Sequence, residues 1–192
     1  MNWSVLRKVQ LVVVGLLLAG GALASEPDGL YTPWLDQTVA GDVVYFAMVH
    51  PPRVDRFNMV QQAWLEPIPT ISPAQAIAAD GQFIVTVEGN QVRRYPLNNE
   101  SSVLLAEFEP PREVLLRDGV VIVHHGDWYS RALTSINLYT GMSIDSLVMG
   151  LSTPQGIAMP RDLRRLYGLT AGSFPGRLVR IEFAADGQFG ST

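Results

Sequence analysis

The stretch "VRRYPL" at residues 92–97 has three close counterparts elsewhere in the chain. They are "VDRFNM" at 54–59, "LTSINL" at 133–138 and "LVRIEF" at 178–183. Each copy of this repeated phrase starts with Val or Leu, has Arg or Ser at its third place, and ends with apolar residues at its fourth and sixth places. Such an alternation predicts a half-buried β-strand. The sequence therefore contains the same kind of strand four times.

A second pattern recurs out of step with the repeated phrase. An aspartate precedes an apolar, strand-like stretch at Asp42, Asp80, Asp118 and Asp162. Asp-Gly at 80–81 and at 118–119 predicts tight turns, because Gly tolerates positive φ and Asp caps its own backbone. A proline leads a further stretch at Pro73, Pro111 and Pro154, and closing strands are expected at 103–108 and 143–149.

These patterns together define units of about 40 residues with four short strands each, which is typical of a β-propeller blade. A single four-stranded sheet cannot bury both of its faces, and radial stacking of blades covers them. A β-sandwich also has short strands, but it gives no reason to repeat the same aspartate and the same phrase. We predict an all-β fold of about four blades of four antiparallel strands. The expected blades are 33–72, 73–110, 111–153 and 154–192.

Residues 136–170, "INLYTGMSIDSLVMGLSTPQGIAMPRDLRRLYGLT", resemble the YVTN-type propeller repeat. The matching residues are Ile136, Thr140, Gly141, Gly150, Pro154, Gly156, Ile157, Ala158, Pro160, Asp162 and Tyr167. Asn137 stands where the family has Asp, and Leu163 stands where it has Gly. The resemblance implies a propeller fold. Because the family includes binding domains, cell-surface proteins and some enzymes, it does not imply one function.

The number of blades leaves three alternatives open. Four is the lower end of the usual range of about four to eight blades in a propeller. The chain is then a half-propeller that a homodimer completes, a fragment of a larger propeller, or a four-bladed ring. An open stack leaves strand edges and an apolar blade face exposed, which favours association.

The first 24 residues have the three parts of a secretory signal peptide. Arg7 and Lys8 precede an apolar run at 11–24, which ends in Ala-Leu-Ala before Ser25. The run is shorter than the roughly 20 residues of a membrane span, so we expect cleavage rather than anchoring. The mature domain would be 25–192, without a membrane span, and it would be exported to the periplasm or the extracellular space.

Charge and cysteine content exclude several classes of function. The loss of Arg7 and Lys8 would change the formal charge from −4 to −6. An acidic domain without a basic tract is a poor candidate for nucleic-acid binding, which needs Lys and Arg against phosphates. The chain has no cysteine, so disulfides, thiolate metal sites and cysteine nucleophiles are excluded.

Two loops are the candidates for a binding face. The distance from the aspartate to the repeated phrase is longer in the third and fourth units, and the added loops are 124–132 and 170–176. Insertions in repeat proteins often mark the working face. The candidate binding residues in these loops are His125, Asp127, Trp128, Tyr129 and Phe174.

A metal site at "HHGDW" is disfavoured. His124 and His125 are adjacent, and adjacent residues of a strand point to opposite faces, so both imidazoles cannot easily reach one ion. Glu107, Glu109 and Glu113 flank Pro110-Pro111 and are interpreted as a solvated turn. The sequence has no Ser-His-Asp signature, phosphate-binding loop or dinucleotide fingerprint, and no metal or cofactor is expected.

Three functional hypotheses remain. The first is an exported binding module that contacts a protein or a small ligand through loops 124–132 and 170–176. The second is an enzyme, such as a lactonase-like, metal-assisted propeller hydrolase. The third is a structural partner that supplies blades to another chain. The absence of a catalytic motif favours the first, because a fold alone implies no chemistry.

Overall fold

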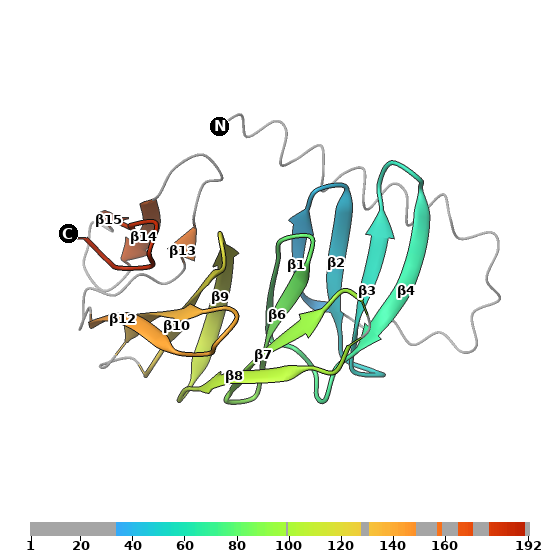
Figure 1. Ribbon diagram of the computed structural model, residues 1–192, viewed down its shortest axis with the longest axis horizontal. Helices are drawn as coiled ribbons and strands as arrows, with labels where there is room; N and C mark the ends of the chain where they lie inside the picture. The colour runs from blue at the N-terminus through green and yellow to red at the C-terminus, as the bar shows by residue number, and fades with distance from the viewer. Residues whose placement is uncertain are drawn as a thin grey trace. The chain divides into compact units, whose positions relative to one another are not determined.

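The computed structural model describes residues 34–98, 100–127, 131–148, 157–158, 165–170 and 177–190. These residues form four antiparallel sheets that follow one another along the chain (Figure 1). Sheet neighbours are also chain neighbours in every sheet, so each sheet is a simple meander. We call the four sheets blades one to four. This architecture confirms the prediction of an all-β, propeller-like fold.

The bounds of the strands are as follows. Blade one consists of β1 (Trp34–Ala40), β2 (Val43–Met48), β3 (Arg53–Asn58) and β4 (Ala63–Pro69). Blade two consists of β5 (Ala76–Ala79), β6 (Phe83–Glu88), β7 (Gln91–Pro96) and β8 (Val103–Glu107). Blade three consists of β9 (Pro111–Arg117), β10 (Val120–His125), β11 (Ala132–Asn137) and β12 (Ser143–Val148). In blade four, the described residues form β13 (Ile157–Ala158), β14 (Arg165–Thr170) and β15 (Arg177–Glu182), and a bridge joins Phe183 to Phe189.

The repeated phrase lies on the third strand of each blade and faces two blades at once. Its first residue faces the next blade: Val54, Val92 and Leu133 are fully buried in clusters with side chains of the following blade. Its fourth residue faces the preceding blade, as Ile136 packs in a cluster with Val85 and Val87 of blade two. Because strand side chains alternate between faces, one phrase contributes to two interfaces. This explains why the sequence repeats it.

The turns between the first two strands differ in length from blade to blade. Arg117 pairs with Val120 across a two-residue turn, whereas Ala79 pairs with Ile84 across a four-residue turn. In blade one, Ala40 pairs with Val43, so Gly41 rather than Asp42 corresponds to Asp118. The sequence alignment of the aspartates is therefore one residue out of register in blade one. The sequence pattern also provided no bounds for β1, the first strand of blade one, which has no leading proline.

The joint between blades one and two is held by a buried carboxylate. Glu88, at the end of β6, accepts hydrogen bonds from the backbone N–H groups of Ile71 (3.1 Å) and Ser72 (3.0 Å) in the linker. It also accepts from the hydroxyls of Thr86 (2.6 Å) and Tyr95 (2.7 Å). Burial and the neighbouring Glu88 carboxylate raise the pKa of the Tyr95 phenol. Four donors on one carboxylate fix the linker to blade two.

The turn after the phrase in blade three requires a glycine. Asn137 accepts hydrogen bonds from the backbone N–H groups of Tyr139 and Thr140, which brings the chain back at Gly141. Gly141 has φ +72°, and a Cβ there would lie 2.9 Å from the carbonyl oxygen of Leu105 in β8. The positive φ and the close backbone contact both exclude a side chain.

Gly141→Ala is expected to lower the free energy of unfolding by about 2 kcal/mol, because the added Cβ meets backbone that cannot move aside. Gly89 is the matched control, since it has φ +60° but a Cβ added there would meet nothing within 4 Å. Gly89→Ala should cost only about 1 kcal/mol, which is the backbone strain alone. Urea unfolding of both variants measures the difference. Equal losses would show that the contact with β8 contributes nothing.

Candidate functional site

A pocket of about 780 Å³ is lined by the first strands of the blades. Its wall is formed by residues of β1, β5 and β9, together with Ile157 of β13. β1 contacts β5, and β5 contacts β9. First strands are the innermost strands of propeller blades and surround the central channel, so the pocket occupies the place of that channel. This position makes it the candidate site.

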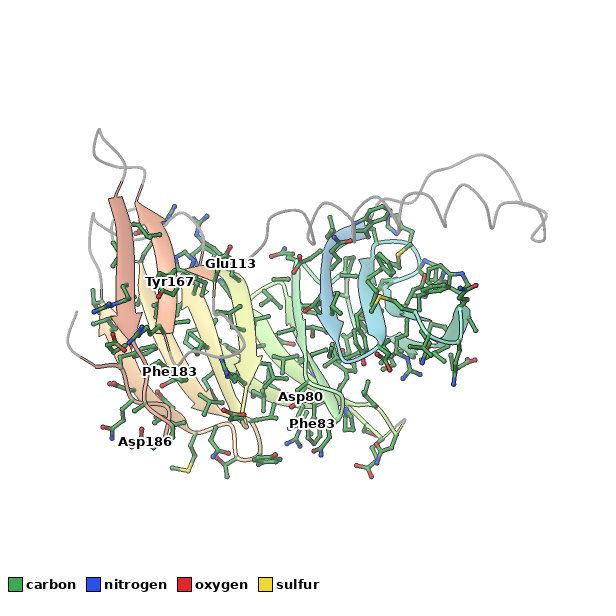
Figure 2. All side chains as sticks on the ribbon, turned by 90° about the horizontal axis from the view of Figure 1, so that it is seen from above. Asp80, Phe83, Glu113, Tyr167, Phe183 and Asp186 are labelled. Atoms are coloured by element: carbon green, nitrogen blue, oxygen red, sulfur yellow. The ribbon has the colours of Figure 1, made fainter. Side chains whose placement is uncertain are left out.

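The charged residues of the pocket form two groups at opposite ends of the strands. Asp36, Arg112 and Glu113 lie near the beginnings of β1 and β9, whereas Asp80, Arg117 and Asp118 lie at or after the strand ends. Figure 2 shows Glu113 and Asp80 toward opposite ends of these strands. We call the end with Asp36, Arg112 and Glu113 the upper mouth.

Glu113 connects three elements at the upper mouth. One of its carboxylate oxygens, Oε2, accepts a hydrogen bond from the backbone N–H of Ile157 in blade four (3.0 Å). The same oxygen lies 3.1 Å from Nδ1 of His124 on β10. His124 is fully buried, and its other ring nitrogen has no hydrogen-bond partner among the described residues. Glu113 is thus held in place by its own blade and by the next one.

Asp36 is the counterpart of Glu113 on blade one. Its Oδ2 accepts a hydrogen bond from the backbone N–H of Ile77 in blade two (2.8 Å), as Glu113 does from Ile157. Burial raises the pKa of Asp36 above its ordinary value, the hydrogen bonds from Ile77 and Gln37 lower it, and the charge of Glu113 raises it further. The two carboxylates are therefore coupled across the pocket. Ala76 occupies the equivalent place in blade two, opposite Val87.

The loop after β10 is attached directly to the upper mouth. Nε of Arg112 donates to the carbonyl oxygen of Gly126 (3.2 Å), and the N–H of Gly126 donates to the carbonyl of Pro110 (3.0 Å). Asp127 follows Gly126 and is exposed. Hence the described part of loop 124–132, proposed from the sequence as a binding face, lies beside the pocket.

The predicted site residues fall into two groups. His125 is half-buried: its Nε2 lies 2.8 Å from the hydroxyl of Thr134, and its ring lies 4.2 Å from that of Phe108. Burial and the charge of His124 lower the pKa of His125, and its role in binding stays a prediction. Trp128, Tyr129 and Phe174 lie outside the described residues, as do loop 170–176 beyond Thr170 and the signal-peptide region.

The two adjacent histidines contact different partners, as strand alternation requires. His124 pairs with Glu113 and His125 with Thr134. Within the part of the chain that the structure describes, no three His, Asp or Glu side chains are grouped as metal ligands would be. In the same residues, no helix is long and apolar enough to cross a membrane.

Sequence reasoning missed Asp36 and Arg112 and misplaced Glu113. Glu113 lies in β9 and faces the pocket, rather than in a solvated turn beside Pro110-Pro111. The position of a strand within its blade could have identified these residues. The first strand of a blade lies innermost, so a polar residue near its start faces the central channel of a propeller. Asp36 lies on β1, a strand for which the sequence pattern provided no bounds.

No family model and no curated protein matches this sequence. Solved structures do match its fold. Hydrazine synthase of Kuenenia stuttgartiensis is similar to 84% of the chain, with a TM-score of 0.64 and 14% identity. A chain of the nidogen/laminin complex matches 77% of it, with a TM-score of 0.57 and 15% identity. The β-propeller domain of the trilobed protease from Pyrococcus furiosus matches 84% of it, with a TM-score of 0.56 and 12% identity.

These likenesses show the fold, and the chain is a β-propeller-type protein. The matched region spans 49% of the hydrazine synthase chain, 60% of the nidogen/laminin chain and 57% of the trilobed protease domain. The chain therefore spans about half the length of these three structures.

Proposed function

We propose that this chain is an exported β-propeller binding module, with YVTN-type repeats, that binds a protein ligand at the upper mouth and the adjoining loop 124–132. The observation that carries the proposal is the bond from Arg112 to the carbonyl of Gly126. Because of this bond, the side chain of Arg112 both lines the pocket and holds the loop in place. A ligand seated on the loop meets Arg112, Glu113 and Asp36 within the same site.

The upper mouth has the features of a recognition site. It is concave, and a few polar groups fixed by neighbouring blades converge on it. Asp36 and Glu113 are held by backbone N–H groups of the following blades, so they lose little freedom when a ligand binds. The nidogen/laminin complex contains a similar chain that assembles with another protein, which supports a protein ligand here.

The test is selection of a random peptide library on the immobilised protein, followed by titration of the selected peptides against variants. Arg112→Ala should weaken their binding about tenfold, which equals about 1.4 kcal/mol, because it removes a charge and releases the loop. Glu113→Gln should weaken basic peptides selectively, because it removes only the charge. Fluorescence anisotropy with labelled peptide measures both.

Arg117→Ala is the matched control, because Arg117 lies at the other end of the same strand. It should leave the peptide affinity within about twofold of the original protein. A library that yields no binder would contradict the proposal. Binders that lose equal affinity in Arg112→Ala and Arg117→Ala would place the site elsewhere.

A further inference from the structure

We infer that blade four of one copy of this chain packs against blade one of a second copy, so that two copies close a ring through two equivalent interfaces. The inference goes beyond the ligand site and does not depend on it. It rests on the repeated phrase, which packs against both neighbouring blades in the inner blades, whereas its outward positions Leu178 and Met59 at the two ends are exposed.

Blade four exposes a residue that is buried in every other blade. Leu178 is the first residue of its phrase and pairs with Leu169, as Leu133 pairs with His124. Leu133, Val92 and Val54 at this position are fully buried against the next blade, but Leu178 is 70% exposed. The side of blade four that would face a next blade is therefore uncovered around Leu178.

Blade one exposes the opposite side of the same phrase. Met59, at the sixth place, is 37% exposed, whereas its counterparts Leu138 and Phe183 are buried against the preceding blade. Phe57, at the fourth place, is only half-buried, although Ile136 in the same place is buried. This side of blade one would face a preceding blade.

An aromatic cluster extends this side of blade one. Phe46 on β2 lies between Trp34 on β1, with ring centroids 5.7 Å apart, and Trp64 on β4, at 6.0 Å. Phe57 lies 5.2 Å from Trp64, which is itself 56% exposed. Phe46 itself is buried, so the exposed part of the cluster is Trp34 and Trp64; exposed Trp beside apolar side chains is typical of a protein interface. We call this surface, with Met59, the blade-one end face.

A polar contact between blades two and three gives one pattern for the fit of the ends, whereas Arg56 at the same place in blade one bonds to the Glu66 carbonyl of its own blade. Arg94, at the third place of its phrase, donates to the carbonyl oxygen of Leu138 in the next blade (2.8 Å). Arg180 has the same place in blade four. Leu138 and Met59 correspond, because their N–H groups bond to the carbonyls of Gly119 and Asp42 in equivalent turns. Arg180 of one copy should therefore donate to the Met59 carbonyl of the other.

Both sides of one such interface lie on the same chain, so a second copy supplies the side that each end lacks. Leu178 and Trp64 are exposed, so the two ends do not cover these side chains within one chain. In a twofold pair, each blade four meets the other copy's blade one, and the assembly closes without leaving an open end. Two copies also match the length of the hydrazine synthase chain and of the trilobed protease domain, of which one copy spans about half.

The first experiment measures the solution mass of the protein, expressed from its full gene and purified as the cell processes it. Light scattering after gel filtration should give twice the intact chain mass. Leu178→Asp and Trp64→Asp should each raise the dimer dissociation constant at least about a hundredfold, because each buries a charge in an apolar interface. Val148→Asp should not, although Val148 is 72% exposed, because it lies on the outer strand β12 of an inner blade.

Mixing the two variants tests the pairing itself. A mixture of Leu178→Asp and Trp64→Asp proteins contains one unaltered pairing, between the blade four that keeps Leu178 and the blade one that keeps Trp64. The mixture should therefore form dimers that neither variant forms alone. If Trp64→Asp unfolds its blade, as circular dichroism would reveal, Met59→Asp replaces it. A monomeric original protein, equal effects of Leu178→Asp and Val148→Asp, or no recovery on mixing would each overturn the inference.

Discussion

Replacement of Glu88 by alanine is expected to lower the free energy of unfolding by about 4 kcal/mol. The carboxylate accepts from two backbone N–H groups and two hydroxyls at the joint between blades one and two. Thr86 and Tyr95 are buried, so no bulk water replaces the lost acceptor. Each orphaned buried donor costs about 1–3 kcal/mol. Urea unfolding, monitored by circular dichroism, measures the loss.

Glu107→Ala is the control in the same blade. Glu107 is exposed and bonds only to the side chain of Gln91 among the interactions described for it, so its loss should cost less than about 0.5 kcal/mol. Glu88→Gln should fall between the two, since its amide keeps one acceptor and turns an NH₂ group toward the donors. A Glu88→Ala protein as stable as the Glu107→Ala protein would show that the hydrogen bonds to the buried Glu88 carboxylate, which we call the Glu88 clamp, do not stabilise the fold.

Replacement of Leu133 by alanine should cost about 3 kcal/mol. Leu133 is the first residue of its phrase and is fully buried with Leu166 and Ile181 of blade four. The lost side chain leaves a cavity between two blades, which neither sheet can close without shifting its register. The measurement is again the free energy of unfolding in urea.

The same substitution at an exposed leucine isolates the effect of the interface. Leu104 on β8 is 43% exposed, and Leu104→Ala should cost no more than about 1 kcal/mol. If both leucines cost the same, the first place of the phrase is not an interface position, and the assignment of its faces to two blades fails.

The blade architecture could be predicted from the sequence because short, local sequence patterns determine it. Alternation in the phrase at 92–97 predicts one strand, and its recurrence predicts the blade. The opposite faces of His124 and His125 follow from the same rule, and the structure confirms them. The register of blade one was wrong because an aspartate can take either place of a two-residue turn: Asp118 is the first residue of its turn, whereas Asp42 is the second.

The candidate site was less accessible because it is assembled from distant segments. Asp36 and Glu113 are 77 residues apart (113 − 36), and no local sequence pattern predicts that they line the same pocket. Glu88 was also missed, since a single acid between a strand and a turn resembles a surface residue. Its role in holding the linker is seen only in the structure, where the backbone N–H groups of the linker that follows blade one donate to its carboxylate.

The clamp at Glu88 also bears on how such a chain could have grown by gene duplication. A copied unit brings both faces of the phrase with it, so its interfaces with older units match from the start. The Glu88 clamp is different, because its donors at residues 71 and 72 precede Pro73, where the repeating unit begins. In blade three, His125 at the corresponding place meets the linker through a ring contact with Phe108 instead. The two boundaries for which the structure describes the linker are therefore held by different contacts, and transplanting blade two without its preceding linker would leave the donors at residues 71 and 72 behind.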